Sequence, residues 1–365
     1  MNKRIGVIGG GASGTFLAIR IKELNPTFSV TIIEKNDKLL KKISVTGNGR
    51  CNYANLGDLK NKYNNDEFAN KIINNLPTNA LVDNFERYGI HPTRIDNLIY
   101  PVSLSAQTVM MMLEKRVNQL GINVLLNEEV TDYKKENDYY SITTNKQVHV
   151  FDVLIFASGG KAYPQLGTDG AIIEIMRKHG YHIETLSPSL CPIKVRENTK
   201  KISGQRVKCH VSLMNNNQLF YEEEGEVLFK DDGLSGIVIL NMSTKINGLK
   251  DQNNVKLVLD LAKGFNNIKK EEYEQYVHPK VASYLEEHNL DIHQVTFSFK
   301  SFYDYNIAEV SHGGVSIEEV TNNLESKKEK GLYFVGELLD VDGMCGGYNL
   351  MFAFASAETA AKAIK

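Results

Sequence analysis

A glycine run near the start of the chain has the spacing that binds a pyrophosphate. Residues 9–14 read Gly-Gly-Gly-Ala-Ser-Gly, which satisfies G-x-G-x-x-G, and Glu34 stands about 20 residues further on. Gly9 permits a tight turn, Gly11 lets a pyrophosphate approach the backbone, and Gly14 lets a helix pack closely on a sheet. An acid at the position of Glu34 accepts hydrogen bonds from a ribose 2′-hydroxyl, and its charge disfavours a 2′-phosphate. The predicted dinucleotide-binding residues of this segment are Gly9, Gly11, Ala12, Ser13, Gly14, Glu34 and Lys35.

These residues need a strand, a helix and a second strand to position them. Lys3–Ile8 is a short apolar run, Thr15–Leu24 has helical spacing, and Val30–Ile33 is a β-branched run that ends at Glu34. The N-terminus of such a helix directs unpaired N–H groups and a partial positive charge at a phosphate. The flanking strand, helix and second strand make the glycine motif specific for a dinucleotide. The alternative is a glycine-rich turn that binds no ligand. The first 35 residues leave FAD and NAD both open.

A second candidate segment, residues 41–52, is rich in glycine, asparagine and cations. It reads Lys-Lys-Ile-Ser-Val-Thr-Gly-Asn-Gly-Arg-Cys-Asn, which is unsuited to a regular element. Backbone N–H groups, with Thr46 and Arg50, are donors that suit a phosphate chain, and a solvated surface loop is the alternative. The cofactor residues predicted here are Lys42, Thr46, Gly47, Gly49, Arg50, Cys51 and Asn52.

Two further buried strands are expected to deliver small residues to the same sheet edge. Val153–Ala157 leads into Ser158-Gly159-Gly160, and Leu332–Val335 leads into Gly336-Glu337. Backbone at the carboxyl edge of a parallel sheet can pass close to a cofactor. Helices are predicted over residues 66–76, 79–88, 106–120 and 348–364, and further strands over residues 122–126, 139–144 and 147–151.

The C-terminal strand, loop and helix favour FAD over NAD. The loop 338–347 holds two acids and three glycines, and a helix follows it. The dipole of that helix suits an anionic reduced flavin, and Asp340 or Asp342 suits the ribityl hydroxyls, with ordinary loop acids as the alternative. A simple NAD dehydrogenase has no need for this element. The cofactor residues predicted from this half of the chain are Ala157, Ser158, Gly159, Gly336, Glu337, Asp340, Asp342, Gly347, Tyr348, Asn349 and Leu350.

From about residue 186 the pattern changes to short strands separated by turns. Strands are predicted over residues 209–214, 218–221, 226–229, 237–241, 255–259 and 295–299, and a helix over residues 269–288. This run of β and then α indicates a β-barrel-like insertion with a small helical part at about residues 266–290. We expect an α/β fold in which residues 1–185 and 311–365 form a discontinuous Rossmann-type FAD-binding domain and residues 186–310 form the insert.

Several blocks resemble, in family order, the BaiN/RdsA-type NAD(P)/FAD-dependent oxidoreductases, some of which carry the name "aminoacetone oxidase family". The blocks are residues 46–52, Tyr163-Pro164 with residues 167–170, residues 225–229 with 233–236, Gly313-Gly314-Val315, and residues 331–343 continuing through 346–350. The resemblance implies a three-part fold with an inserted domain. Likeness to related flavoproteins implies that a backbone group at Val130 holds adenine.

Composition limits the partners of the chain. Its 365 residues carry a net charge of −2, which gives no electrostatic case for nucleic acid or an anionic membrane. Its four cysteines form no C-x-x-C, which weighs against a dithiol flavoenzyme and a zinc site. No apolar run reaches membrane-spanning length, and the default expectation is a cytoplasmic protein. The sequence does not indicate an oligomeric state.

The expected activity is that of an FAD-dependent oxidoreductase whose small organic substrate binds between flavin and insert. The resemblance favours an NAD(P)H-dependent reductase of an activated C=C bond, with tightly bound FAD. Since a second G-x-G-x-x-G is lacking, a nicotinamide donor would dock transiently. The alternatives are an oxidase or dehydrogenase of a small amine or ketone, a tRNA-modifying flavoprotein, which would need a basic face, and a non-catalytic flavin-binding redox module.

No catalytic residue and no metal ligand are assigned from the sequence. No Ser–His–Asp order or metal-ligand spacing stands out. His312, beside Gly313-Gly314, is a residue that could face the flavin, and Tyr163 is a comparable proton-donor candidate. An ordinary loop histidine and a packed tyrosine are the alternatives. Cys345 is near the proposed flavin loop in sequence, but a lone cysteine is usually inert.

Overall fold

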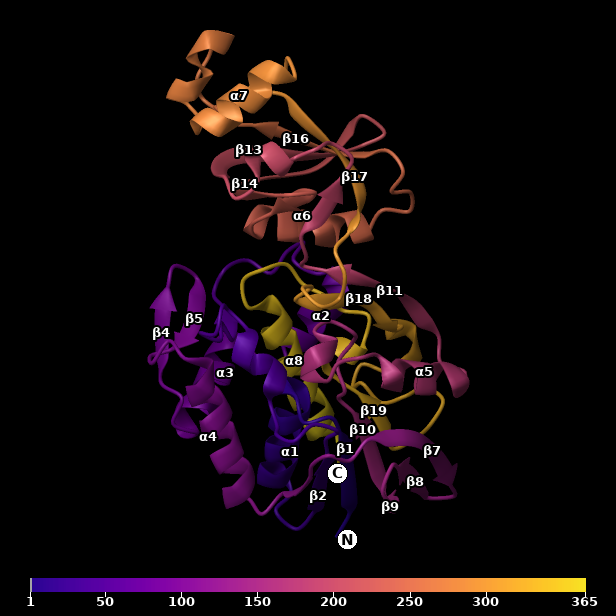
Figure 1. The fold of residues 1–365 in the computed structure, drawn as a ribbon. Helices are drawn as coiled ribbons and strands as arrows, with labels where there is room; N and C mark the ends of the chain where they lie inside the picture. The colour runs from indigo at the N-terminus through magenta and orange to yellow at the C-terminus, as the bar shows by residue number, and fades with distance from the viewer. Residues whose placement is uncertain (1) are drawn as a thin grey trace. The chain divides into compact units, whose positions relative to one another are not determined.

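The chain folds into two compact units, one of them discontinuous. Figure 1 shows the computed structural model, which describes residues 2–365, so that Met1 lies outside the described residues. The first unit joins Met1–Ser187 to Val310–Lys365, and the second is the continuous segment Pro188–Glu309. The first unit carries the candidate nucleotide site.

A five-stranded parallel sheet forms the centre of the first unit. Its order is β19 (Leu332–Phe334), β10 (Val153–Phe156), β1 (Arg4–Ile8), β2 (Ser29–Ile33) and β6 (Asn123–Leu125). Residues 5–8 and 30–33 are buried throughout, as expected for strands covered on both faces. Ile8 pairs with both Ile33 and Phe156. This register brings the residues that follow β1, β2 and β10 to one edge of the sheet.

Two long helices pack against each other beside this sheet. They are α1 (Ala12–Leu24) and α8 (Tyr348–Ala363), which lie side by side in Figure 1 although they come from opposite ends of the chain. The Phe354 ring lies 5.3 Å from the Phe16 ring and 5.1 Å from the Phe85 ring, between centroids. Such edge-on contacts of buried rings stabilise the helix pair beyond their area. The C-terminal helix is therefore part of the core that supports the glycine turn.

Smaller elements complete the first unit. The other helices are α2 (Asp66–Ile73), α3 (Thr78–Arg87), α4 (Ala106–Gln119) and α5 (Ala171–Lys178). The small antiparallel sheets are β3 (Ala54–Asn55) with β5 (Leu98–Pro101) and β4 (Pro92–Ile95), β7 (Val130–Glu136) with β8 (Tyr139–Thr144) and β9 (Val148–Phe151), and β11 (Ile183–Ser189) with β18 (Val310–Val315). The predicted helices around Pro77 and the predicted 139–151 meander are confirmed, whereas α5 and β7 were not predicted.

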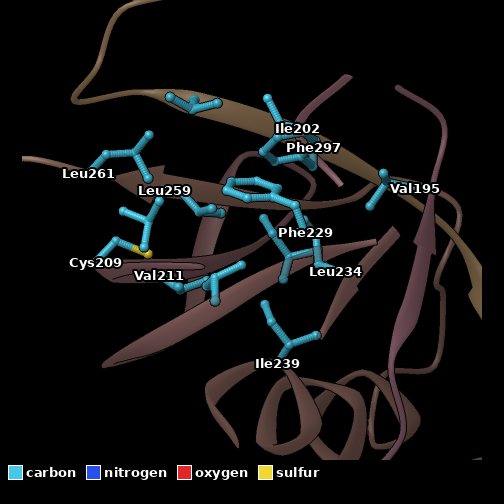
Figure 2. Close-up of a cluster of buried hydrophobic side chains, with 14 of the residues drawn as sticks. Val195, Ile202, Cys209, Val211, Phe229, Leu234, Ile239, Leu259, Leu261 and Phe297 are labelled. Atoms are coloured by element: carbon cyan, nitrogen blue, oxygen red, sulfur yellow. The ribbon is translucent and has the colours of Figure 1, made fainter. Parts of the chain in front are cut away.

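The second unit is a closed antiparallel barrel with two helices. The strands run in the order β12 (Ile193–Val195), β15 (Gly233–Ser235), β14 (Gln218–Lys230), β13 (Arg206–Asn215), β16 (Val255–Asp260) and β17 (Val295–Phe302), and β17 pairs back onto β12. The helices are α6 (Ile237–Asn247) and α7 (Pro279–Glu287). Alternate residues of β16 are buried, the period-two pattern of a barrel strand. Figure 2 shows the apolar core, with Phe229 and Phe297 at its centre and Ile239 of α6 against it. The predicted fold class is confirmed.

Three predictions within this unit were wrong. Residues 237–241, predicted as a strand from their β-branched side chains, begin α6. Gly236 has a φ of 102°, and a Cβ there would lie 2.2 Å from the Glu226 carbonyl oxygen, so the chain turns sharply at the end of β15. Burial of α6 against the barrel then overrides local β propensity.

The other two errors concern element boundaries. The strands predicted at 218–221 and 226–229 are one continuous strand, β14. The helix predicted at 269–288 is a 3₁₀ segment, Lys270–Gln275, followed by the separate helix α7. Pro279 explains the division, because proline is tolerated in the first turn of a helix and not in its interior.

Candidate functional site

The glycine turn after β1 is closely packed on one side and open on the other. Gly9 has a φ of 102°, and its N–H donates to the Ile33 carbonyl oxygen over 2.9 Å. A Cβ on Gly14 would lie 1.9 Å from the Gly9 carbonyl oxygen and 3.1 Å from the Ala157 Cβ, so helix and turn touch here. A Cβ on Gly11 would meet nothing within 4 Å. The glycines therefore have different functions, and the space at Gly11 is open to a ligand.

The first turn of α1 is suited to an anion. Gly11 is the N-cap residue, no side chain caps the helix, and its first turn has no acidic residue. The N–H groups that open a helix have no intrahelical partner and carry the positive end of its dipole. Ala12 and Ser13 lie in this turn, and Gly336 passes so close to it that a Cβ would lie 2.5 Å from the Ser13 Oγ. A phosphate bound here would accept hydrogen bonds from the unpaired N–H groups at the start of α1.

Glu34 is fixed beside the glycine turn by three hydrogen bonds. Its Oε2 accepts from the Gly10 N–H over 2.7 Å, and its Oε1 accepts from the Asn36 N–H over 2.9 Å and the Asn36 Nδ2 over 2.7 Å. The residue is only 8% exposed. A carboxylate offers about four lone-pair sites, so one remains for a ligand hydroxyl. The Glu34 carboxylate is therefore already held in one orientation before a ligand binds.

A cavity of about 480 Å³, which includes space open to solvent, lies at the edge of the sheet beside Glu34. It is lined by six of the predicted residues: Gly9, Glu34, Lys35, Val130, Ser158 and Gly159. The Ser158 hydroxyl is buried and has no partner among residues 2–365. Because a buried hydroxyl without a partner costs about 1–3 kcal/mol, a polar group of a bound ligand would relieve that cost.

Other lining residues were not predicted as site residues, namely Glu128, Glu129, Gly160, Gly167, Asp169, Gly170, Ala171 and Ile172. Lys35 forms an ion pair with Asp169 over 2.7 Å, and the Asn36 Nδ2 donates to the Leu166 carbonyl oxygen over 3.2 Å. Burial raises the pKa of Asp169, but Lys35 outweighs it and holds that pKa below its ordinary value. The glycines at positions 167 and 170 are the sequence signal that could have identified these residues, because backbone without side chains can lie close to a ligand.

A second group of predicted residues meets around Glu337. The Glu337 Oε2 pairs with the Lys42 Nζ over 2.7 Å, and its Oε1 accepts from the Ser311 N–H over 2.9 Å. The Ser311 Oγ in turn accepts from the N–H groups of Lys161 over 2.6 Å and Ala162 over 2.9 Å. Four segments far apart in sequence are joined here. Lys42 and Glu337 neutralise each other, so Lys42 is positioned by the C-terminal loop.

The two acids of the C-terminal loop have different environments. Asp340 accepts from the Nδ2 groups of Asn64 over 2.8 Å and Asn65 over 2.9 Å, and burial raises its pKa. Asp342 is fully buried, and its Oδ1 lies 2.8 Å from the His312 Nδ1. Burial lowers the pKa of His312, but Asp342 outweighs it and the pKa is raised. His312, for which the sequence left two interpretations, is thus held against the predicted flavin loop.

The start of α8 gathers most of the remaining predicted residues. Gly347 is the N-cap residue at a φ of 88°, and a Cβ there would lie 2.9 Å from the Asn52 Oδ1. The Asn349 Nδ2 donates to the Gly343 carbonyl oxygen, and the Gly343 N–H donates back to the Asn349 Oδ1, each over 2.8 Å. This exchange fixes the loop before the helix. Tyr348 and Leu350 flank Asn349 in the first turn.

The glycine-rich segment of residues 41–52 contacts the groups around Glu337 and the start of α8 through only some of its residues. The 3₁₀ turn Lys41–Val45 precedes it, and the Thr46 hydroxyl donates to the Ile43 carbonyl oxygen over 2.8 Å. Gly47 and Gly49 both adopt positive φ. The Cys51 thiol is buried, which raises its pKa to about 12 and keeps it neutral. The exposed Arg50 places its guanidinium 5.2 Å from the centre of the Tyr100 ring.

Comparison with known proteins identifies the family. A model described as "HI0933-like protein Rossmann domain" matches residues 3–363. The chain belongs to the HI0933-like family. This is the BaiN/RdsA-type flavoprotein family that the motifs resemble, so that prediction is confirmed and the protein is a flavin-dependent oxidoreductase.

Curated relatives match along almost the whole chain. The 3-dehydro-bile acid delta(4,6)-reductase of Clostridium scindens is 30% identical, covering 99% of this chain and 98% of the relative. The ribosomal RNA dihydrouridine synthase of Haemophilus influenzae is 26% identical over 98% and 97%. Among solved structures, the 3-ketosteroid-delta4-(5alpha)-dehydrogenase of Rhodococcus jostii RHA1 shares the fold, with a TM-score of 0.51, 11% identity and coverage of 98% and 97%.

The geometry of this HI0933-like chain fits a flavin dinucleotide. The open space at Gly11, the uncapped N-terminus of α1 and the partnerless Ser158 hydroxyl are features that a bound dinucleotide would complete. None of the helices within residues 2–365 has both the length and the apolar character needed to cross a membrane.

Proposed function

We propose that this protein is an FAD-dependent reductase that uses NAD(P)H to reduce a C=C bond conjugated with a carbonyl group in a small organic molecule. One observation carries the proposal: the end-to-end similarity to a curated enzyme named as a reductase of a 3-dehydro-bile acid. The match covers both units, so similarity is not confined to the nucleotide-binding residues.

The names of the two curated relatives support the same reaction type. A 3-oxo steroid with double bonds at positions 4 and 6 and a uracil ring both contain a C=C bond conjugated with a carbonyl group. Reduction of either adds a hydride to one carbon and a proton to the other. The reaction type is therefore better supported than the identity of the substrate.

Residues of the first unit would hold FAD in two parts. Gly11 and the first turn of α1 would bind the pyrophosphate, and Glu34 would accept from the adenosine ribose. Val130, Ser158 and Gly159 would surround the rest of the adenosine in the cavity. The riboflavin half would meet the group around Gly336, Asp340, Asp342, Gly347, Asn349 and Leu350. FAD, when bound, supplies two-electron hydride chemistry.

The overall reaction balances with a reduced nicotinamide and one proton. The nicotinamide loses a hydride and is oxidised, while the C=C π bond breaks and two C–H bonds form. Since the sequence contains only one G-x-G-x-x-G framed by strand and helix, we propose that the nicotinamide binds transiently.

Reduction of uridine in RNA is a second candidate, favoured by the Haemophilus influenzae relative. The distribution of charge opposes it. The chain has a net charge of −2, and β14 carries four glutamates, at residues 222, 223, 224 and 226. RNA binding requires Lys and Arg gathered on one face, and its affinity falls steeply with salt. Salt-dependent retention of a ribosomal RNA fragment would favour this candidate.

The decisive experiment is an anaerobic titration of the purified protein with NADPH and then NADH, followed by the yellow flavin absorbance. Bleaching by either donor, and recovery of the colour on adding 4-androstene-3,17-dione or 2-cyclohexen-1-one, is the expected result. Recovery only with a uridine-containing rRNA fragment would favour the second candidate. A protein that neither donor bleaches, but that is reduced by an amine or ketone, would overturn the proposal in favour of an oxidase or dehydrogenase.

A further inference from the structure

A histidine on β18 and a buried aspartate of the C-terminal loop form a close pair. The His312 Nδ1 lies 2.8 Å from the Asp342 Oδ1, and Asp342 has no exposed surface. The His312 side chain keeps 20% of its surface exposed. Because the aspartate can only accept, it holds the proton on Nδ1 and orients the ring. The Nε2 makes no hydrogen bond with any of residues 2–365 and is the atom left to react.

The backbone on both sides of His312 is fixed. A Cβ on Gly313 would lie 2.3 Å from the Thr185 carbonyl oxygen, and one on Gly314 would lie 2.5 Å from the Leu338 carbonyl oxygen. On the other side, Ser311 is hydrogen-bonded to Glu337 and to the Lys161 and Ala162 N–H groups. His312 therefore sits on a rigid strand, β18, that is packed against the loop leading from Gly336 to α8. A precise position of this kind is needed for proton transfer.

The charges facing His312 are negative. Asp340 and Asp342 of the C-terminal loop and Glu184 of β11 all raise its pKa, against the opposing effect of burial. One atom each from His312, Asp340 and Asp342 lies within 4.8 Å of the others. Burial, together with the charge of Asp342, also raises the pKa of Asp340, although His312 acts in the opposite direction. Each of these acids therefore favours the protonated imidazole over the neutral one.

We propose that His312 is the proton donor of the reductive reaction and that Asp342 is its positioning residue. The assignment rests on the proposed function, which needs a proton as well as a hydride. The His312 Nε2–H bond breaks and its proton forms a C–H bond at the carbon next to the substrate carbonyl. The second C–H bond would be formed by the hydride that NAD(P)H supplies, through the chemistry that FAD provides when bound. The neutral imidazole left behind regains its proton from water.

A purely structural role is the competing explanation, in which the hydrogen bond only ties β18 to the C-terminal loop. The substitution His312→Asn separates the two explanations. An asparagine amide can still donate to Asp342 but cannot transfer a proton. The control is His179→Asn, because His179 also pairs with an aspartate, its Nε2 lying 2.8 Å from the Asp132 Oδ1, and does not line the candidate site.

The test measures the two half-reactions of the flavin-loaded protein separately. In His312→Asn, bleaching by NAD(P)H should stay within about twofold of the unmodified protein. Recovery of the yellow colour on adding 4-androstene-3,17-dione or 2-cyclohexen-1-one should slow by about 10²- to 10⁴-fold, the usual contribution of a positioned acid. In His179→Asn both rates should be unchanged.

A readout other than activity comes from NMR of the full chain labelled with ¹³C at the histidine ring carbon Cε1. The resonance missing in His312→Asn identifies His312, and its titration gives the pKa. Asp342→Asn should lower that pKa, and the recovery rate should then fall away at a lower pH than in the unmodified protein. If the pair were only structural, the recovery rate of Asp342→Asn would depend on pH in the same way as that of the unmodified protein.

Failure of the proposed function and failure of the proton-donor assignment give different results. If the reduced unmodified protein is not reoxidised by either enone, the proposed function fails, and this assignment with it. If the unmodified protein is reoxidised and His312→Asn is equally fast, or if Asp342→Asn leaves the His312 pKa unchanged, only the assignment of the proton donor is overturned.

Discussion

The two parts of the candidate site differ in how they are built. Around Gly9, Gly11 and Glu34, backbone and one carboxylate leave a cavity, an uncapped helix end and a partnerless hydroxyl. Around Glu337, Asp342 and His312, side chains have already paired with one another. The first part is shaped to accept a ligand, whereas the second is a tied network with few free groups. Substitutions at groups that face the open space should therefore lower ligand affinity, and substitutions at groups that are packed or already paired should lower protein stability.

The largest effect should come from Gly14→Ala. Its Cβ would lie 1.9 Å from the Gly9 carbonyl oxygen, so the backbone must move. We expect a loss of at least about 3 kcal/mol in the free energy of unfolding, at the upper end for overpacking. Thermal or urea unfolding of the flavin-free protein measures it.

Gly11→Ala is the matched control, because a Cβ there meets nothing within 4 Å. It should leave the unfolding of the flavin-free protein unchanged and raise the flavin Kd at least about tenfold, or about 1.4 kcal/mol. An unchanged flavin Kd in Gly11→Ala would show that the space at Gly11 has no connection with the flavin.

Glu34→Ala should act on both affinity and stability. Loss of the ribose hydrogen bonds should weaken FAD binding by about 1–3 kcal/mol for each bond, because the acceptor is charged. The N–H of Gly10 also loses its acceptor, so the flavin-free protein should become less stable by about 1–3 kcal/mol. Flavin content and urea unfolding measure the two effects, and unchanged flavin content would count against the assignment.

The His312–Asp342 pair should make stability depend on pH. Since the His312 pKa is raised above 6.5, its contribution is complete below about pH 6.5 and is lost as the pH rises through the raised value. The contribution is about 1.4 kcal/mol for each unit by which the pKa is raised. Urea unfolding from pH 6 to pH 9 checks this. The dependence should shrink in Asp342→Asn, and an unchanged slope would rule out the pair as its source.

Arg50→Ala should have the smallest effect on stability. The side chain is exposed and contacts the face of Tyr100, a contact worth about 0.5–1 kcal/mol at such a site. We predict weaker flavin binding through loss of a contact to phosphate or flavin, which isothermal titration of the flavin-free protein measures. An unaltered flavin Kd would remove Arg50 from the site.

The geometry of the first part of the candidate site is easier to predict from the sequence because that part is local. Strand, turn, helix, strand and acid are consecutive, so the spacing from Gly9 to Glu34 almost determines the geometry. The second part depends on pairs such as Lys42 with Glu337, which are 295 positions apart, and no periodicity reports such a contact. The Lys35–Asp169 pair was missed for the same reason.

The errors in the insert have a different cause. For the segment that begins α6, a run of β-branched residues outweighed the helix that burial on the barrel stabilises. Pro279, in contrast, is a local signal that the predicted helix 269–288 must divide, and the structure shows the break there. The first error arose because packing overrode local propensity, whereas the second arose because a sufficient local signal, the proline, was overlooked.

The discontinuity of the first unit determines the order in which the chain can be completed during synthesis. The barrel strands all lie within Pro188–Glu309, so the second unit can close while the residues that follow it are still being added. The parallel sheet must wait for β19, and α1 must wait for α8. Until α8 has left the ribosome, the apolar face of α1 lacks its partner and the nascent first unit is exposed to aggregation.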